Sequence, residues 1–192
     1  MIKSVKVLLG VLACLMVTDG YAQKVFVDYS GRVIIDASAI RHTTTNKPRT
    51  TDATNTTGGW NGASDIASME NNQWVYRQFE VSKTASSWGV DWLTAVKGCE
   101  NWSENGGGWR LPTHKELMLM LILRSELEQF GITDWLHYNS FSNYWSATET
   151  SATRSLVIEF KYLSMYASFK DISNLSPGNQ SYFGYRCIRD IR

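Results

Sequence analysis

The spacing of hydrophobic residues changes several times along the chain, and each change predicts a different element. Near the N-terminus, an alternating segment at residues 25–27 and a β-branched run at residues 33–35 flank a Ser30-Gly31 turn signal, which predicts a short hairpin. Residues 43–57 are rich in threonine and show no apolar period. This composition indicates a solvated linker or a long surface loop.

A shift in composition near residue 70 favours a domain boundary there and precedes a denser hydrophobic pattern. The aromatic-rich segment 74–81 predicts a strand. Ser86 or Ser87 is a suitable cap for a helix whose hydrophobic positions continue to Cys99. We therefore expect a strand followed by an amphipathic helix in this region.

A second helix is predicted after the glycine run 106–108. Thr113 and Glu116 have the spacing of a capping box, in which each side chain accepts a hydrogen bond from the other residue's backbone N–H. The helix is expected over residues 114–130. Because residues 117–123 are all apolar, it should be largely buried, and this run is too short to span a membrane.

The C-terminal part of the chain is predicted to form strands. These are residues 143–148, 155–162, 165–170 and 182–191. A turn is expected at Leu163 and Ser164, and residues 174–179 form a loop around Pro177 and Gly178. The order of strand, helix, helix and several strands predicts an α+β fold with an antiparallel sheet.

The first 22 residues have the pattern of a secretory signal peptide. Basic residues precede an apolar run at residues 7–17, and small residues fit a cleavage site after Ala22. The alternative is a lipobox, which residues 11–14 resemble, although the apolar run continues past Cys14. We expect a secreted, periplasmic or outer-surface protein that is attached to a membrane only if Cys14 is lipidated.

Charge and composition exclude several classes of partner. Lys and Arg number 19 and Asp and Glu 18, so the formal net charge is +1. Removal of residues 1–22 takes away two lysines and one aspartate and leaves a neutral chain. A neutral chain has no global basic field with which to hold nucleic acid. Aromatic residues make up 12% of the sequence, which is enough for a packed core.

Two cysteines, Cys99 and Cys187, remain after the expected cleavage. An even pair in an exported protein favours a disulfide. Metal ligation is the alternative, but His42, His114 and His137 lie at no zinc-like spacing to the two cysteines. We therefore predict a disulfide, no metal site and no cofactor.

The second half of the chain contains several short motifs. They are Cys99, Gly108-Trp109-Arg110-Leu111-Pro112-Thr113 with Glu116-Leu117, Tyr144-Trp145-Ser146-Ala147-Thr148, and Tyr185-Arg186-Cys187-Ile188-Arg189. In this order they resemble the Lcl C-terminal domain and the related Fibrobacter succinogenes major paralogous domains. The resemblance covers residues 73–192. Residues 23–72 lie outside it and are expected to form an N-terminal extension.

The resemblance implies a C-type-lectin-like fold, with two helices flanking a twisted antiparallel sheet whose first and last strands pair. A cysteine of the first helix would bridge to one in the final strand, which agrees with the Cys99–Cys187 pair. Trp109 would fill the core, Arg110 would pair with an acid or a carbonyl, and Pro112 would end an extended segment. Structural roles are also expected for Leu111, Glu116 and Trp145.

The function expected from this resemblance is a non-enzymatic binding module, such as a bacterial adhesin or a pilus-associated subunit. Proteins of this fold bind a protein or glycan through loops between the later strands, here residues 135–141, 150–154 and 172–182. The candidate ligand-binding residues are Trp135, Tyr138, Asn139, Asn174, Asn179 and Tyr182. Core packing and turn chemistry are the competing explanation for them. The calcium-binding triplets of sugar-binding lectins do not occur, so calcium is not predicted.

Two other functions remain open. Formylglycine-generating enzymes share the Trp-Arg-Leu-Pro-Thr-x-x-Glu motif and a terminal stretch similar to residues 184–187, but they need a reactive cysteine pair. Here both cysteines are expected in a structural bridge, and no catalytic residues are predicted. Alternatively, residues 23–72 supply a strand to a neighbouring pilus or surface subunit.

Overall fold

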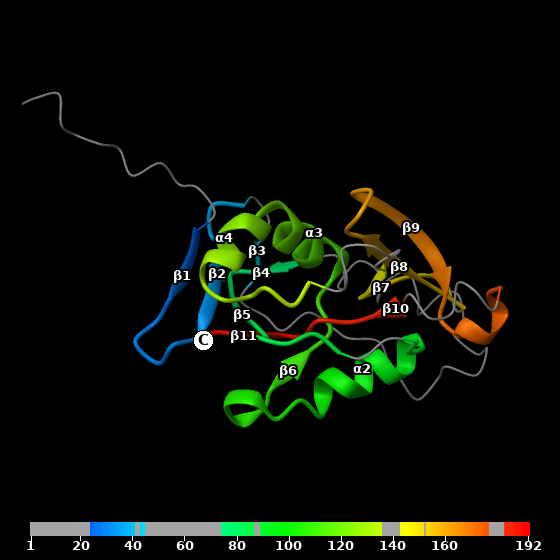
Figure 1. The fold of residues 1–192 in the computed structure, drawn as a ribbon, viewed down its shortest axis with the longest axis horizontal. Coiled ribbons are helices and arrows are strands. Elements are labelled where there is room, and N and C mark those ends of the chain that lie inside the picture. Colours follow the sequence, from blue (N-terminus) through cyan, green and yellow to red (C-terminus); the bar gives the residue numbers. More distant parts are fainter. Residues whose placement is uncertain are drawn as a thin grey trace, which may run out of the picture.

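The structure is a computed structural model in which some stretches of the chain are described. These are residues 24–40, 43–44, 74–86, 89–135, 143–151, 153–176 and 183–192. The predicted signal peptide with Cys14 and Ala22, and most of the threonine-rich segment, lie outside the described residues. The described chain is a mixed α+β structure with two larger sheets side by side (Figure 1).

The first sheet contains the predicted N-terminal hairpin. Its strands, in spatial order, are β1 Lys24–Val27, β2 Val33–Asp36, β5 Gln78–Val81, β11 Ile188–Asp190 and β6 Trp109–Arg110. Every neighbouring pair is antiparallel. The hairpin is therefore confirmed. Because β2 pairs with β5, part of the segment 23–72 belongs to the same sheet as strands from residues 73–192.

The second sheet is built from the C-terminal part of the chain. Its strands, in order, are β10 Phe183–Gly184, β7 Asn143–Ser151, β8 Arg154–Glu159 and β9 Ser164–Phe169. The pairs β7–β8 and β8–β9 are antiparallel, whereas β10 runs parallel to β7. Leu163, at the predicted turn between β8 and β9, has a positive φ of 53°.

Two predicted strands are each divided because their halves pair in different sheets. The segment 182–191 forms β10 in the second sheet and β11 in the first, with residues 185–187 between them. The segment 74–81 forms β4 Val75–Tyr76 and β5. Strand β4 pairs in parallel with β3 Thr43–Thr44. A continuous hydrophobic pattern cannot reveal such a change of partner.

Helix α2, Trp92–Glu100, begins later than predicted. Its cap is Asp91, whose side chain accepts a hydrogen bond from the Thr94 backbone N–H at 2.7 Å. The prediction of a cap at Ser86 or Ser87 was wrong because this stretch hydrogen-bonds to the C-terminal chain. The Ser86 N–H donates to the Tyr185 carbonyl and the Val90 N–H to the Phe183 carbonyl.

Helix α3, His114–Ile122, starts with the predicted capping box. The Thr113 hydroxyl accepts from the Glu116 N–H, and the Glu116 carboxylate accepts from the Thr113 N–H. The predicted single helix is interrupted at Leu123, after which α4 covers Arg124–Gln129. The described residues also include two short 3-10 turns, η3 Glu104–Gly106 and η4 Ile172–Asn174.

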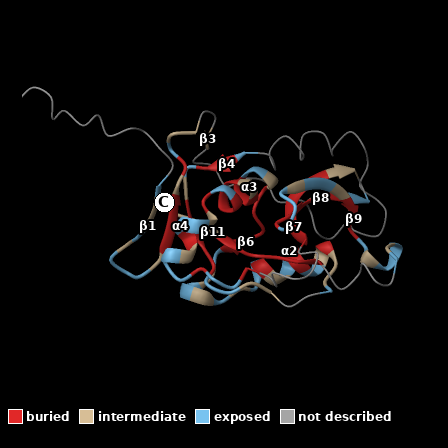
Figure 2. Cartoon of the chain, turned by 45° about the horizontal axis from the view of Figure 1, so that its top comes forward, coloured by how far each residue is buried: buried red, intermediate tan, exposed pale blue. Residues whose placement is uncertain are grey.

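In the second sheet, most of β7 and the second half of β8 are buried on both faces, whereas most of β9 is half-buried or exposed; Figure 2 colours buried residues red. Tyr144 and Ile158 are opposite each other and belong to a core shared with α3 and the first sheet. The next pair, Trp145 and Val157, points to the other face and packs into a core with α2. Consecutive residues of β7 and β8 therefore serve two different cores.

The predicted disulfide between Cys99 and Cys187 is present. The two Cα atoms are 5.4 Å apart, within the usual range for a disulfide. Both residues are almost fully buried in the core beneath α2. The bond thus joins helix α2 to the segment that leads into β11. Among the described helices, none has the length and apolar character needed to cross a membrane.

Candidate functional site

The Trp-Arg-Leu-Pro motif is part of the framework that supports the two sheets. The Arg110 guanidinium is fully buried and donates to both oxygens of Glu116 and to Oδ1 of Asp190. Burial alone would lower the pKa of Arg110, but the neighbouring carboxylates of Glu116 and Asp190 raise it overall. Trp109, Leu111 and Trp145 are also buried. Among the described residues, Arg110 thus joins the motif strand to the start of α3 and to β11, which is a structural role.

Pro112, the last residue of the Trp-Arg-Leu-Pro motif, is buried and links the motif to the second sheet: its carbonyl accepts from the Ala147 N–H at 2.7 Å. The residue therefore does more than end an extended segment. It connects the segment before α3 with strand β7.

Arg186 binds the backbone carbonyls of two separate segments, residues 82–83 and Asp134. It donates to the carbonyls of Ser82, at 2.6 Å, and Lys83, at 3.1 Å, and also to the carbonyl of Asp134. Its guanidinium lies 4.7 Å from the centre of the Trp135 ring. Burial lowers the pKa of Arg186. This arginine is another structural tie.

The predicted ligand-binding residues do not form one site among the described residues. Trp135 is 8% exposed and stacks on Phe160, with the ring centres 5.2 Å apart. It is therefore a core residue. Asn174 is exposed on η4, where its side chain donates to the Asp171 carbonyl at 3.4 Å. Tyr138, Asn139, Asn179 and Tyr182 lie outside the described residues.

The β8–β9 hairpin carries a group of exposed hydrophobic side chains that are not among the predicted ligand-binding residues. We call this group the apolar hairpin patch; it consists of Tyr162, Leu163, Met165 and Tyr166, exposed by 57%, 69%, 46% and 39%. Strand β9 is the outer strand of its sheet in the described structure (Figure 1). Large apolar residues at a predicted turn were the available sequence signal, because such turns are ordinarily polar.

A row of polar residues crosses the second sheet beside this patch. Asn143 of β7 is opposite Glu159 of β8, and Glu159 is opposite Ser164 of β9. The Ser164 hydroxyl donates to Glu159 Oε2 at 3.0 Å. Asn143 Oδ1 and Glu159 Oε1 are buried and have no hydrogen-bond partner among the described residues. The row therefore holds two oxygen atoms that can each still accept a hydrogen bond.

Tyr166 lies on the same face of the sheet as this row, because it is two residues from Ser164 along β9. Burial, followed by the negative charge of Glu159, raises the pKa of the Tyr166 phenol to about 12. The phenol is therefore protonated at neutral pH and able to donate a hydrogen bond. It contributes both to the apolar hairpin patch and to the polar row.

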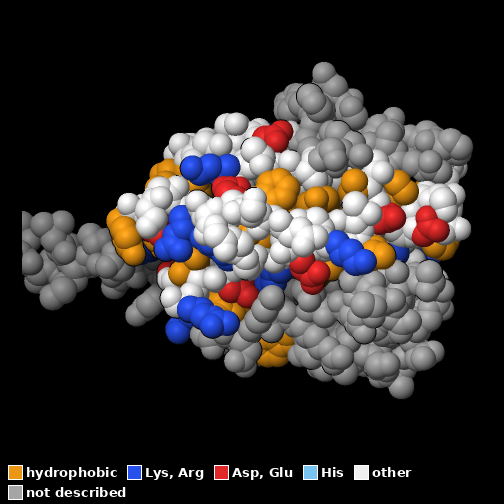
Figure 3. All heavy atoms as spheres, turned by 90° about the horizontal axis from the view of Figure 1, so that it is seen from below, with side chains coloured by type: hydrophobic (Ala, Val, Ile, Leu, Met, Phe, Trp, Pro, Cys, Tyr) orange, Lys and Arg blue, Asp and Glu red, His pale blue; other side chains and the backbone are white. Residues whose placement is uncertain are grey.

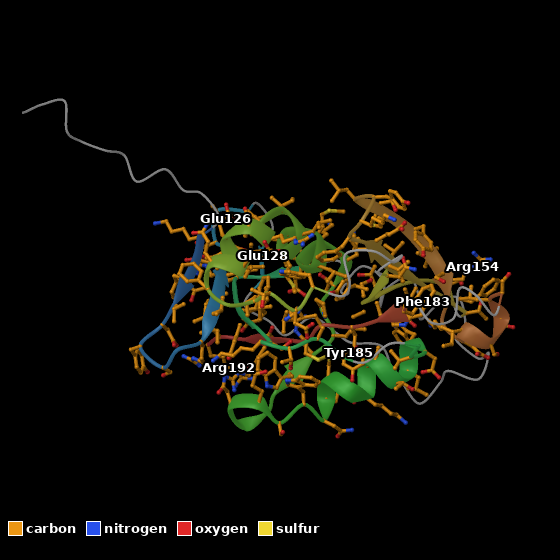
Figure 4. The ribbon with its side chains drawn as sticks, in the orientation of Figure 1. Glu126, Glu128, Arg154, Phe183, Tyr185 and Arg192 are labelled. Carbon is orange, nitrogen blue, oxygen red and sulfur yellow. A yellow bond between two sulfur atoms is a disulfide. The ribbon has the colours of Figure 1, made fainter. Side chains whose placement is uncertain are left out.

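Charged side chains of the described residues are mixed in sign on the surface that Figure 3 draws. At the outer strand, the Arg154 guanidinium lies over the Phe169 ring, 4.0 Å from its centre, and Figure 4 shows Arg154 beside β9. Within the described stretches, no group of three or more His, Cys, Asp or Glu residues is arranged to hold a metal ion.

Comparison with known proteins adds no family assignment. No protein-family model matches the sequence, and a search of curated proteins finds no match.

Proposed function

We propose that this protein is an exported, non-enzymatic binding module with a C-type-lectin-like fold that recognises a protein partner through the β8–β9 hairpin. The observation that carries the proposal is the apolar hairpin patch, four large hydrophobic side chains exposed on one hairpin. Clustered apolar exposure with aromatic residues is typical of protein interaction sites, whereas scattered single residues are ordinary. Adhesion to a surface protein is the role that fits an exported module of this kind.

Three features support the lectin-like fold. Helix α2 is joined by a disulfide to the segment before the last strand. Residues 73–192 resemble the Lcl C-terminal domain, and β5 is the first strand of this region that belongs to the first sheet. It pairs with the last strand, β11. Two main helices, α2 and α3, pack on the sheets. These are the features that the resemblance implies.

The state of the cysteines favours binding over formylglycine-type catalysis. That chemistry needs accessible, reactive thiols. Cys99 and Cys187 are joined to each other and are exposed by 0% and 1%. The third cysteine, Cys14, belongs to the predicted signal peptide.

The alternative of a donated N-terminal strand is less well supported. Strands β1 and β2 pair with each other, and β2 also pairs with β5 of the same chain. Val33 and Ile35 are buried in the chain's own core. Donation of this hairpin to a neighbouring subunit would first require these contacts to be broken.

A binding comparison with matched surface variants tests the proposal. The full, oxidised chain is applied to arrays of surface proteins and of glycans, next to the double variant Leu163→Ser/Met165→Ser. Phe130→Ser is the control because Phe130, which follows α4, has 40% exposure and lies outside the patch. We expect a protein hit that the double variant weakens at least tenfold and the control leaves unchanged.

Two results would contradict the proposal. The first is a hit that the double variant and the control weaken equally, since the patch would then have no special role. The second is selective binding to glycans that is indifferent to the patch. Circular dichroism of both variants checks that each is folded, which is expected because the replaced side chains are exposed.

A further inference from the structure

We propose that Asn143 and Glu159 form an acceptor site for one cationic side chain, a lysine or arginine of the protein partner. The inference rests on the proposed function for the nature of the partner. The site itself is argued from the unused hydrogen-bonding capacity of two buried side chains.

Both side chains are too deeply buried to be satisfied by bulk water. Asn143 is 5% exposed and Glu159 is 9% exposed. A buried polar atom without a hydrogen bond is costly, and a buried carboxylate without a positive partner is more so. Glu159 forms no ion pair with a described lysine or arginine. A positive group from another molecule would supply what the site lacks.

The other buried carboxylates of the described chain make the contrast clear. Glu116 is paired with Arg110, Glu80 with Arg189, and Glu149 with Lys170. Each of these glutamates is at most 2% exposed on its side chain and has a cation of the same chain within ion-pair distance. Glu159 is the exception, and it lies beside the patch proposed for partner binding.

The geometry of the row suits a donor group with more than one N–H. Asn143 and Glu159 are directly opposite across an antiparallel pair, where side chains are about 4.5–5.5 Å apart at Cβ. An ammonium or guanidinium group can donate to both oxygens at once, whereas the Ser164 hydroxyl already occupies Glu159 Oε2. The electron-rich face of Tyr166 lies on the same side of the sheet and favours a cation.

The site lies near an exposed edge. Glu159 is one strand away from the outer strand of the described sheet, β9, whose Ser164 and Tyr166 are on the same face. Neighbouring strands are about 4.8 Å apart, so a long basic side chain can span the distance. Both acceptor oxygens are closed to solvent in this structure. Binding therefore requires a side chain at the rim, such as the 39%-exposed Tyr166, to move.

Charge-matched probes test the proposal on the unaltered protein. The full, oxidised chain is titrated with Nα-acetyl-lysine methylamide and Nα-acetyl-arginine methylamide, and chemical shifts are followed by NMR. The neutral analogues carry norleucine and citrulline in place of lysine and arginine, and methyl mannoside represents hydroxyl-rich ligands. We expect saturable shifts at residues 143, 159 and 164 with the cationic probes, and at least tenfold weaker effects with the neutral ones.

Substitution of Glu159 provides a second test of the acceptor site. Glu159→Gln keeps the shape of the side chain and should weaken the cationic probes at least tenfold. Glu126→Gln on α4 is the control, because Glu126 is an exposed carboxylate outside the site (Figure 4). If Glu159→Gln does not fold, the comparison of charged and neutral probes on the unaltered chain still tests whether the site binds a cation.

Three outcomes would overturn the proposal. They are equal responses to charged and neutral probes, a response to mannoside alone, or an Asn143 amide group that already donates to Glu159 in the free protein and is unaffected by the cations. Because the probes need no protein partner, this result is separate from that of the array experiment. The cationic probes could bind in the NMR titration while the patch variants leave binding on the arrays unchanged. That result would refute the proposed partner surface but not the acceptor site.

Discussion

Arg110 and Glu116 form a two-pronged ion pair in the interior of the protein. Nη1 and Nη2 of the arginine each donate to a different carboxylate oxygen at 2.7 Å. The same carboxylate accepts from the backbone N–H groups of Tyr76 and Thr113, both at 2.8 Å. Glu116 therefore joins the start of α3, the strand β4 and the motif strand β6.

Replacement of Glu116 by glutamine should be strongly destabilising. The variant removes one of the two carboxylates that pair with the fully buried Arg110 guanidinium, the other being Asp190. Breaking a buried pair costs about 3–5 kcal/mol in free energy of unfolding. Urea unfolding followed by circular dichroism measures the loss. Glu126→Gln, at an exposed position, should change stability by less than about 0.5 kcal/mol. Similar losses in both variants would show that the buried pair contributes little.

The disulfide should contribute a large part of the stability. It closes a loop with a sequence separation of 88, for which the chain-entropy relation gives about 4.5 kcal/mol as an upper value. The double variant Cys99→Ala/Cys187→Ala should therefore unfold at a clearly lower urea concentration than the oxidised protein. A peptide map under oxidising conditions checks the link itself. Unchanged stability after removal of both sulfurs would contradict this prediction.

Gly98 should not tolerate a side chain. A Cβ at this position of α2 would lie 2.0 Å from the hydroxyl oxygen and 2.5 Å from the Cζ of Tyr185, which Figure 4 shows beside α2. Gly98→Ala should cost about 1–3 kcal/mol because the ring must move. Tyr185→Leu should remove most of this penalty in the double variant. Additive effects of the two substitutions, measured by urea unfolding, would show that the two positions do not interact.

His114 should make stability depend on pH below neutrality. Burial, followed by the positive charge of Lys115, lowers the pKa of the imidazole from its ordinary 6.5 to about 4. The unfolded chain therefore binds a proton more readily than the folded protein, and the stabilisation present above pH 6.5 is lost as the pH falls toward 4. Urea unfolding of the wild type and of His114→Asn at pH 7 and pH 4.5 measures the difference. The wild type should lose more stability on acidification; equal losses would contradict the assigned direction.

Local sequence signals were sufficient to predict the elements whose structure depends on residues close together along the chain. The capping box at Thr113 and Glu116 and the hairpin at residues 24–36 occur where the sequence predicts them. Their signals depend on residues that are close along the chain, and the local backbone satisfies them. The Cys99–Cys187 disulfide was also predictable, because only two cysteines remain beyond the expected signal peptide.

The candidate site could not be predicted in the same way. Trp135 was expected on a loop surface and is instead stacked on Phe160 in the core. Glu159 was expected only as one residue of a strand, and nothing in its neighbourhood along the chain shows that a cation is missing. That property depends on the strands on either side of it and on the depth at which the sheet is buried.

The sequence alone determined the α+β class, the hairpin, the capped helix and the cysteine pair. The tertiary structure decided where α2 begins and how the last strand is divided between two sheets. It also decided which buried glutamate forms no ion pair with a described lysine or arginine. The two groups differ because the second depends on contacts between residues that are far apart along the chain. The Tyr185 N–H donates to the Ser86 hydroxyl across 99 residues at 2.9 Å, and a bond of this kind overrides the helix-capping preference of the serine.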